Sequence, residues 1–230
     1  WGSVAVEARV GSILDTLSDA ITNVFARSLR LVAGSSSAGT IGASLQAIET
    51  EVFTLSAVAG GAMHLREATS VTVGQSLTAS VGRVQGNSAT DVATALATGA
   101  DLVAGAALVI ELDSGSLTLD DGNTNGIALS AAGNVLIRTA ATTGDIDVNA
   151  GISVAGGGAN SLAGHLSINA GQDLLLDASV TTAATNATID LLAGRDIRQG
   201  TAVQSVTVSS ANGDIAWRAG QDIVLETVNS

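Results

Sequence analysis

A pattern of alternating apolar residues that ends in Ala-Gly recurs along the chain and constrains its fold more than any other feature. Its clearest copies are LSINAGQDLLLDASV, IDLLAGRDIRQGTAV and IAWRAGQDIVLETVN, which begin at Leu166, Ile189 and Ile215. In each copy the residues five, three and one positions before the glycine are apolar. The same frame fits ten anchor positions, which are Gly11, Gly34, Gly60, Gly82, Gly105, Ala132, Gly151, Gly171, Gly194 and Gly220.

Alternation with a period of two predicts β-strands in which every second side chain points to the same face. The anchors lie 19–27 residues apart with a mean spacing near 23, which is too short for a helical repeat. One such coil buries its inner face only against the coils above and below it. We therefore predict an all-β fold: a right-handed parallel β-helix, or β-solenoid, of about ten coils.

The frame also predicts which side chains point inward and which residues form the corners. Triplets such as Val6/Ala8/Val10 and Leu77/Ala79/Val81 are assigned to the core on this basis. The core residues predicted in the more regular half are Ile146, Val148, Leu166, Ile168, Ile189, Leu191, Ile215 and Trp217. The structural turn anchors predicted there are Gly151, Gly171, Gly194 and Gly220, where positive φ or a close backbone approach excludes a side chain.

Composition fits this architecture and excludes several functions. Apolar residues make up 46% of the chain but aromatics only 2%, so the core is built from small and β-branched side chains. Nine basic residues against 21 acidic ones, with a net charge of -12, argue against nucleic acid as a partner, because phosphate binding needs a basic patch. The chain lacks cysteine and any apolar run long enough for membrane insertion.

We expect residues 1–230 to form a single β-solenoid domain, because no linker or shift in composition interrupts the repeats. The chain begins at Trp1 with neither Met nor a signal peptide, so we interpret it as a fragment or processed unit of a longer protein. Two stretches, Ser12 to Arg30 and Ser88 to Ala100, contain good helix formers, but the regular anchor spacing around the first favours strand. The segment Asp120 to Gly126 reads as an enlarged turn.

Two groups of acidic residues are weak candidates for Ca²⁺, and no other cofactor is expected. Asp173, Asp196 and Asp222 occupy the same position in successive coils, so their carboxylates would stack about 5 Å apart. The favoured alternative is that each Asp caps backbone N–H groups in its own turn. Asp120 and Asp121 belong to an oxygen-rich loop, but the loop lacks the spacing of an EF-hand, and a structural turn is favoured.

The sequence does not predict an enzyme. The carboxylate pairs Asp145/Asp147 and Glu111/Asp113 each share one face of a strand, as glycoside chemistry would need. No row of exposed aromatic residues accompanies them, however, and such pairs are common on an acidic surface. The single histidines, His64 and His165, form no metal motif.

The repeats resemble a known family. NAGQDLLL (169–176), LAGRDIRQ (192–199), RAGQDIVL (218–225) and, more loosely, AAGNVLIR (131–138) resemble the repeats of filamentous-haemagglutinin-like adhesins, giant secreted bacterial proteins of the two-partner type. That resemblance implies a right-handed parallel β-helix exported across a Gram-negative envelope, hence an extracellular or cell-surface location. It also implies a shaft that presents an adhesive tip.

Three functions therefore remain in view. The first is a structural shaft segment of a large adhesin-like protein, extending a binding element from the cell. The second is a self-assembling subunit of an extracellular filament or sheath that stacks end to end through its terminal coils. The third is a carbohydrate-binding β-helix. The partners to consider are adjacent coils of the parent chain, neighbouring copies, and a host or surface receptor or glycan.

Overall fold

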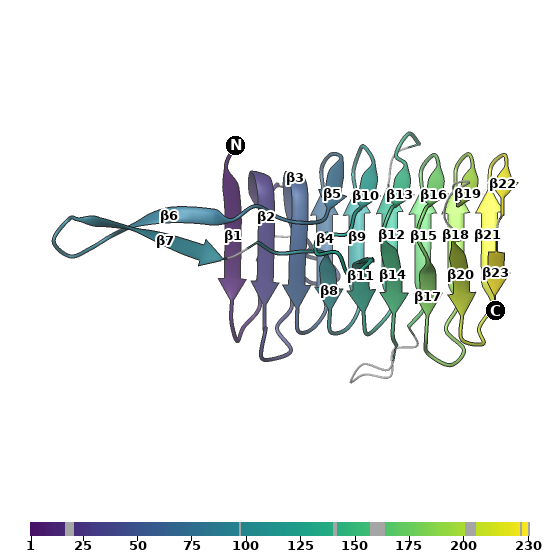
Figure 1. Ribbon diagram of the computed structural model, residues 1–230, viewed down its shortest axis with the longest axis horizontal. Coiled ribbons are helices and arrows are strands. Elements are labelled where there is room, and N and C mark those ends of the chain that lie inside the picture. The colour runs from purple at the N-terminus through teal and green to yellow at the C-terminus, as the bar shows by residue number, and fades with distance from the viewer. Residues whose placement is uncertain are drawn as a thin grey trace.

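The computed structural model describes residues 1–16, 21–96, 98–139, 142–156, 164–200, 206–225 and 227–229. This part of the chain contains no helix. Twenty-one strands form one sheet wound into a parallel β-solenoid of about eight coils, and two further strands form a separate antiparallel hairpin (Figure 1). The prediction of an all-β parallel β-solenoid is confirmed.

Each regular coil contributes one short strand to each of three faces, and corresponding strands pair in parallel from coil to coil. The first face contains β1 (Ser3–Ala8), β2 (Val24–Ala33), β3 (Ile48–Ala59), β8 (Leu102–Ala104), β11 (Ile127–Ala131), β14 (Gly151–Val154), β17 (Val180–Thr182), β20 (Thr207–Ser210) and β23 (Thr227–Asn229). The second contains β4 (Met63–Glu67), β9 (Leu108–Leu112), β12 (Val135–Thr139), β15 (Leu166–Ala170), β18 (Ile189–Ala193) and β21 (Ile215–Ala219). The third contains β5 (Val71–Val73), β10 (Leu117–Leu119), β13 (Ile146–Val148), β16 (Leu174–Leu176), β19 (Ile197–Gln199) and β22 (Ile223–Val224).

The first coils depart from this scheme because their strands are longer. The 12 residues of β3 take part in all three faces. Its first residues pair with β4, its middle residues with β5 and its last residues with β8. A short loop separates Ile41, which bridges to Met63, from Ile48, which pairs with Leu65. The N-terminal coils are therefore less regular than those that follow.

Alternation along the strands places the core inside the coils. In β15 the residues Leu166, Ile168 and Ala170 are buried while Ser167 and Asn169 lie outward, and β18 repeats the pattern. Six of the eight predicted core residues are at most 1% exposed. Ile215 and Trp217 are only partly buried, because β21 is the outermost second-face strand in the described part of the chain.

The predicted number of coils was too high. The structure has about eight coils with a repeat of about 26 residues, where the frame predicts ten and a mean near 23. The reason is that the frame matches corners between different faces. Gly105 and Ala132 follow first-face strands, Gly171, Gly194 and Gly220 follow second-face strands, and Gly151 begins β14. Some anchor intervals therefore measure part of a coil.

The predicted glycine anchors differ from one another in what they require. A Cβ on Gly194 would lie 2.1 Å from the carbonyl oxygen of Gly171, and one on Gly220 would lie 2.1 Å from that of Gly194. The corner after the second face therefore demands glycine through close approach of successive backbones. The approach at Gly151 is less close, since a Cβ there would lie 2.9 Å from Cδ1 of Ile127 and 3.0 Å from the carbonyl oxygen of Gly126.

One predicted coil does not exist. Around Gly82 the chain leaves the solenoid as an antiparallel hairpin of β6 (Ala79–Val84) and β7 (Thr90–Leu96), which projects past β1 (Figure 1). Leu77 and Val81, assigned to the core by the frame, are 53% and 52% exposed, and Val10 is 73% exposed. The strand expected over Ser12 to Arg30 is found from Val24 onward, and residues 17–20 lie outside the described residues.

Candidate functional site

A ladder of polar side chains runs along the corner before the third face. We call it the Ser/Asp ladder, and its members each precede a third-face strand: Ser70, Ser116, Asp145, Asp173, Asp196 and Asp222. In every step, a side-chain oxygen accepts the backbone N–H of the next member at 3.0–3.2 Å. The parallel register requires this contact, because it places the equivalent residues directly above one another. Each side chain thus caps the next coil, whereas the sequence interpretation assigned the capped N–H to the same turn.

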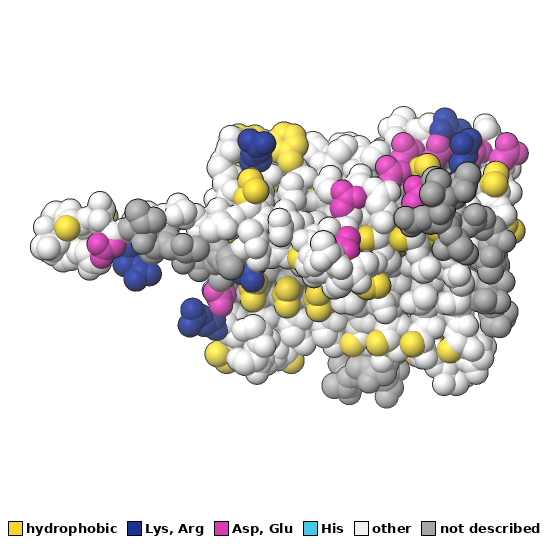
Figure 2. Space-filling view, viewed as in Figure 1, with side chains coloured by type: hydrophobic (Ala, Val, Ile, Leu, Met, Phe, Trp, Pro, Cys, Tyr) yellow, Lys and Arg dark blue, Asp and Glu magenta, His cyan; other side chains and the backbone are white. Residues whose placement is uncertain are grey.

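Arginines neutralise the middle of this ladder. Nε of Arg195 donates to Oδ1 of Asp173 at 2.7 Å, and the same guanidinium also contacts the second carboxylate oxygen. This hydrogen bond holds the pKa of Asp173 below its ordinary value. Asp196 lies 3.7 Å from Arg195 and 3.5 Å from Arg198. Figure 2 shows acidic and basic side chains gathered over the C-terminal coils, at the upper right.

Two of the three carboxylates in the suggested calcium column, those of Asp173 and Asp196, already have partners. Each Asp from Asp145 to Asp196 accepts a backbone N–H, and two of them contact guanidinium groups. In the part of the chain that the structure describes, no three His, Asp or Glu side chains converge as a metal cluster would. Calcium at Asp173, Asp196 and Asp222 stays a prediction.

The loop between β10 and β11 is organised by two aspartates, as expected for an enlarged turn. The carboxylate of Asp121 accepts the backbone N–H of Asn123 at 2.9 Å and of Gly126 at 2.6 Å, which lowers its pKa. Asp120 accepts a hydrogen bond from the side chain of Asn149 at 2.8 Å. Asp101, buried and at φ 59°, accepts from the N–H of Gly122, and its burial raises its pKa. The loop uses its oxygens to satisfy its own backbone.

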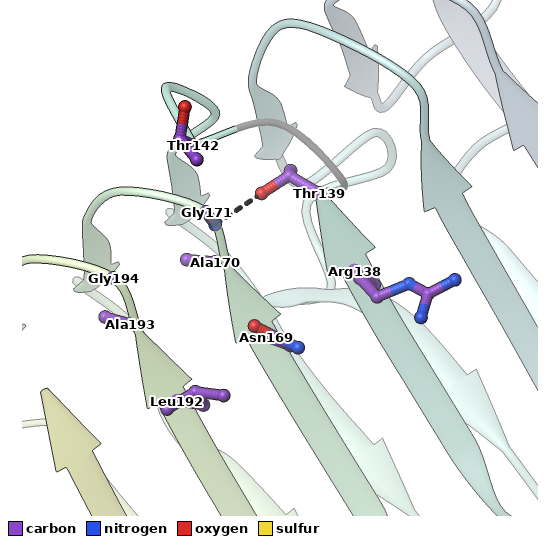
Figure 3. Close-up of a pocket in the computed structure, with 9 residues that line it drawn as sticks. All are labelled: Arg138, Thr139, Thr142, Asn169, Ala170, Gly171, Leu192, Ala193 and Gly194. Carbon is purple, nitrogen blue, oxygen red and sulfur yellow. Dashed lines mark hydrogen bonds between the residues drawn. The ribbon is translucent and has the colours of Figure 1, made fainter.

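A shallow hollow of about 470 Å³ lies where β12, β15 and β18 end (Figure 3). Thr139 closes part of it by accepting the N–H of Gly171 at 2.7 Å and donating to the carbonyl of Gly144 at 3.0 Å. Arg138 points away from the other lining residues (Figure 3) and is ion-paired with Glu111 of the preceding coil. The nine described residues that line it include no carboxylate, imidazole or thiol.

Three of the four carboxylates considered for glycoside chemistry have structural partners. Glu111 pairs with Arg138, and Asp113 accepts from Arg66 at 2.8 Å. Asp145 belongs to the Ser/Asp ladder. Asp147 is half-buried, and burial together with the neighbouring carboxylates raises its pKa. These contacts are the ones that an acidic surface uses to stabilise stacked coils.

The two histidines lie on the second face and do not meet. His64 belongs to β4 and His165 precedes β15, which is separated from β4 by β9 and β12. Burial lowers the pKa of His64. The backbone N–H of Thr188 donates to Nδ1 of His165 at 3.0 Å, so the imidazole caps a neighbouring coil.

A buried carboxylate in the N-terminal coils was not among the predicted site residues. Glu67 is fully buried at the end of β4. It accepts hydrogen bonds from Oγ1 of Thr50 at 2.7 Å and from the N–H of Val52 at 3.2 Å. Burial raises its pKa to about 7. A signal was present, because in MHLRE the glutamate continues the inward alternation of Met63 and Leu65.

A cluster of exposed aromatic residues was also not predicted. Trp1, which the sequence left without an interpretation, packs against Phe25 and Phe53. The rings come from residues 24 and 52 positions away in the chain, so only the strand register reveals that they meet.

The chain was compared with family models, with curated proteins and with solved structures, and none of the three comparisons found a match. The resemblance to filamentous-haemagglutinin-like repeats therefore rests on the repeat motif alone. Within the described residues, no helix is long and apolar enough to cross a membrane.

Proposed function

We propose that this chain is a structural shaft segment of a large secreted or cell-surface bacterial adhesin-like protein. The observation that carries this proposal is the uninterrupted ladder of parallel strands on the first face, from β1 to β23. It is supported by a continuous core of fully buried aliphatic side chains. A role in extension needs repeated coils that stack and stay soluble, and nothing more specific than that.

Polar contacts between coils add to this support. The Ser/Asp ladder ties five successive steps of the same corner, and Arg66, Arg138 and Arg218 each pair with an acidic residue of a different coil. Ladder hydrogen bonds, core contacts and ion pairs thus all act between coils. Pulling along the axis has to break many of these contacts together.

A self-assembling filament subunit is the second candidate. All first-face strands run in the same direction, so a second copy translated along the axis would present its β23 parallel to β1. Such a head-to-tail contact does not close on itself and would grow into a filament.

Electron microscopy of the purified chain at micromolar concentration separates the two candidates. Eight coils at roughly 4.8 Å predict separate rods about 40 Å long, with the hairpin protruding from one end. Separate rods support the shaft. Regular end-to-end fibres would reject the shaft as the function of this chain and favour the filament.

A further inference from the structure

The few aromatic residues of this protein are concentrated on one exposed surface. The chain has only two Trp and two Phe, with no Tyr. Trp1, Phe25 and Phe53 lie together although they are 67%, 52% and 65% exposed. The ring of Trp1 meets Phe25 edge-on at 5.7 Å between centroids and Phe53 at 6.4 Å. Figure 2 shows hydrophobic side chains beside a basic one where β1 to β3 begin.

Strand register explains why three distant rings share this surface. Trp1 precedes β1, Phe25 lies in β2 and Phe53 lies in β3, which are neighbouring strands of three successive coils. Alternation turns both phenylalanines outward, because Ala26 and Val52 beside them point inward and are at most 2% exposed. Core packing therefore does not use these rings.

Beside the rings is a groove of about 610 Å³ with mixed chemistry. Trp1, Phe53 and Leu77 supply its apolar lining, and Arg27, Thr54 and Gln75 supply polar groups. Among the described residues, Arg27 makes no ion pair or side-chain hydrogen bond, whereas six of the nine arginines are paired with an acid of the same or a neighbouring coil. Its five N–H donors remain available to a ligand.

We propose that this aromatic groove binds a neutral polysaccharide. A sugar ring presents an apolar face of C–H groups that can stack on an exposed aromatic ring, and a rim of hydroxyls that pair with guanidinium, amide and hydroxyl groups. Three rings on coils roughly 4.8 Å apart suit an extended chain of repeating units better than a compact ligand. The net charge of -12 disfavours a polyanion, and the unpaired guanidinium of Arg27 in the groove disfavours a polycation, which leaves neutral sugars. This site does not depend on the shaft role.

Intrinsic tryptophan fluorescence tests the proposal. In a Trp217→Phe background Trp1 is the remaining tryptophan, and the probes are hexasaccharides of neutral hexoses with different linkages and of uronic acids. We expect a neutral hexasaccharide to change Trp1 emission saturably at millimolar concentration or below. Phe53→Ala should weaken that binding at least tenfold, and Arg27→Ala should weaken it by a smaller factor.

Leu45→Ala is the matched control, because Leu45 is an apolar residue that is 91% exposed and does not line the groove. It should leave the affinity unchanged, and Phe53→Tyr, which keeps an aromatic ring without adding a tryptophan, should retain binding. Circular dichroism checks that each variant keeps its β-structure. Failure of every neutral probe, equal affinity in Phe53→Ala and the parent, or binding of uronic-acid chains alone would each overturn the proposal.

Discussion

The N-terminal coils and the C-terminal coils share the same parallel strand pairing but differ in regularity and in the surface that they present. From β15 to β22 each coil has short strands, alternating burial and stacked glycine corners. From β1 to β5 the strands are longer, the chain makes an extra loop, and the coils carry the aromatic groove. The regular coils repeat the same stacking contacts from coil to coil, whereas the irregular coils form a distinct surface feature, the aromatic groove.

One inward position shows the contrast at the level of single residues. Strand pairing aligns Thr50 with Glu67 and Glu67 with Leu112, and two coils further on Ala170 aligns with Ala193. In β15, β18 and β21 this position is alanine. In the N-terminal coils a buried glutamate fills it and caps the N–H of Val52. The irregular region thus depends on a titratable group where the regular region does not.

The largest predicted effect comes from charges placed in the core, and it tests whether the stability of both regions depends equally on the core. Ile168→Asp and Leu65→Asp each place a carboxylate at an inward position that is 1% exposed. We expect either change to destabilise the fold by more than about 4 kcal/mol, because the charge is buried without a partner. Asn169→Asp, one residue outward from Ile168, should be nearly silent. Urea unfolding followed by circular dichroism measures all three, and a mild effect of Ile168→Asp would contradict the inward assignment.

The next effect concerns pH and distinguishes the regions. The pKa of Glu67 is raised to about 7 in the folded state, so between pH 4.5 and 7 the unfolded state releases the proton first and stability falls as pH rises. The shift corresponds to about 3 kcal/mol, fully lost above pH 7. We expect Glu67→Gln to remove this loss, measured as the difference in unfolding free energy between variant and parent from pH 4 to 8. Identical pH profiles would show that Glu67 titrates normally.

A smaller effect concerns the Ser/Asp ladder in the regular coils. Asp173→Ala removes the acceptor for the N–H of Asp196 and the partner of Arg195. We expect a loss of about 1–2 kcal/mol in thermal or urea unfolding, because a partly buried N–H is left unpaired. Asp173→Asn keeps an acceptor and should cost less. Repeating the measurement with Ca²⁺ tests the calcium prediction, which requires stabilisation that Asp173→Ala abolishes.

The smallest effect concerns the hairpin of β6 and β7. Its residues from Ser80 to Asp91 are exposed, and it pairs only with itself. Replacing residues 80–95 with a short Gly-Ser linker should lower the free energy of unfolding by less than about 1 kcal/mol, since few buried contacts are lost. The melting temperature should therefore change little. A large drop in melting temperature would show that the hairpin is part of the solenoid's folding unit.

Parts of the candidate sites were open to prediction from the sequence and parts were not. The equivalence of Asp173, Asp196 and Asp222 follows from their common place in the motif, and their register agrees. The extension of the same ladder to Ser70 and Ser116 did not follow, because serine and aspartate look unrelated until their coils are aligned. The aromatic groove could not be predicted, since its members belong to the irregular coils where the motif is weakest.

In the regular coils the sequence by itself determined the strands, the parallel stacking and the inward residues, because local alternation decides which face of a strand can be buried. Tertiary structure decided how many coils there are, where the chain leaves the solenoid, and which side chains meet across coils. The frame around Gly82 looks like the frame around Gly105, yet the first lies in a hairpin and the second at a corner. Such a difference depends on pairing between distant strands, which a local pattern does not encode.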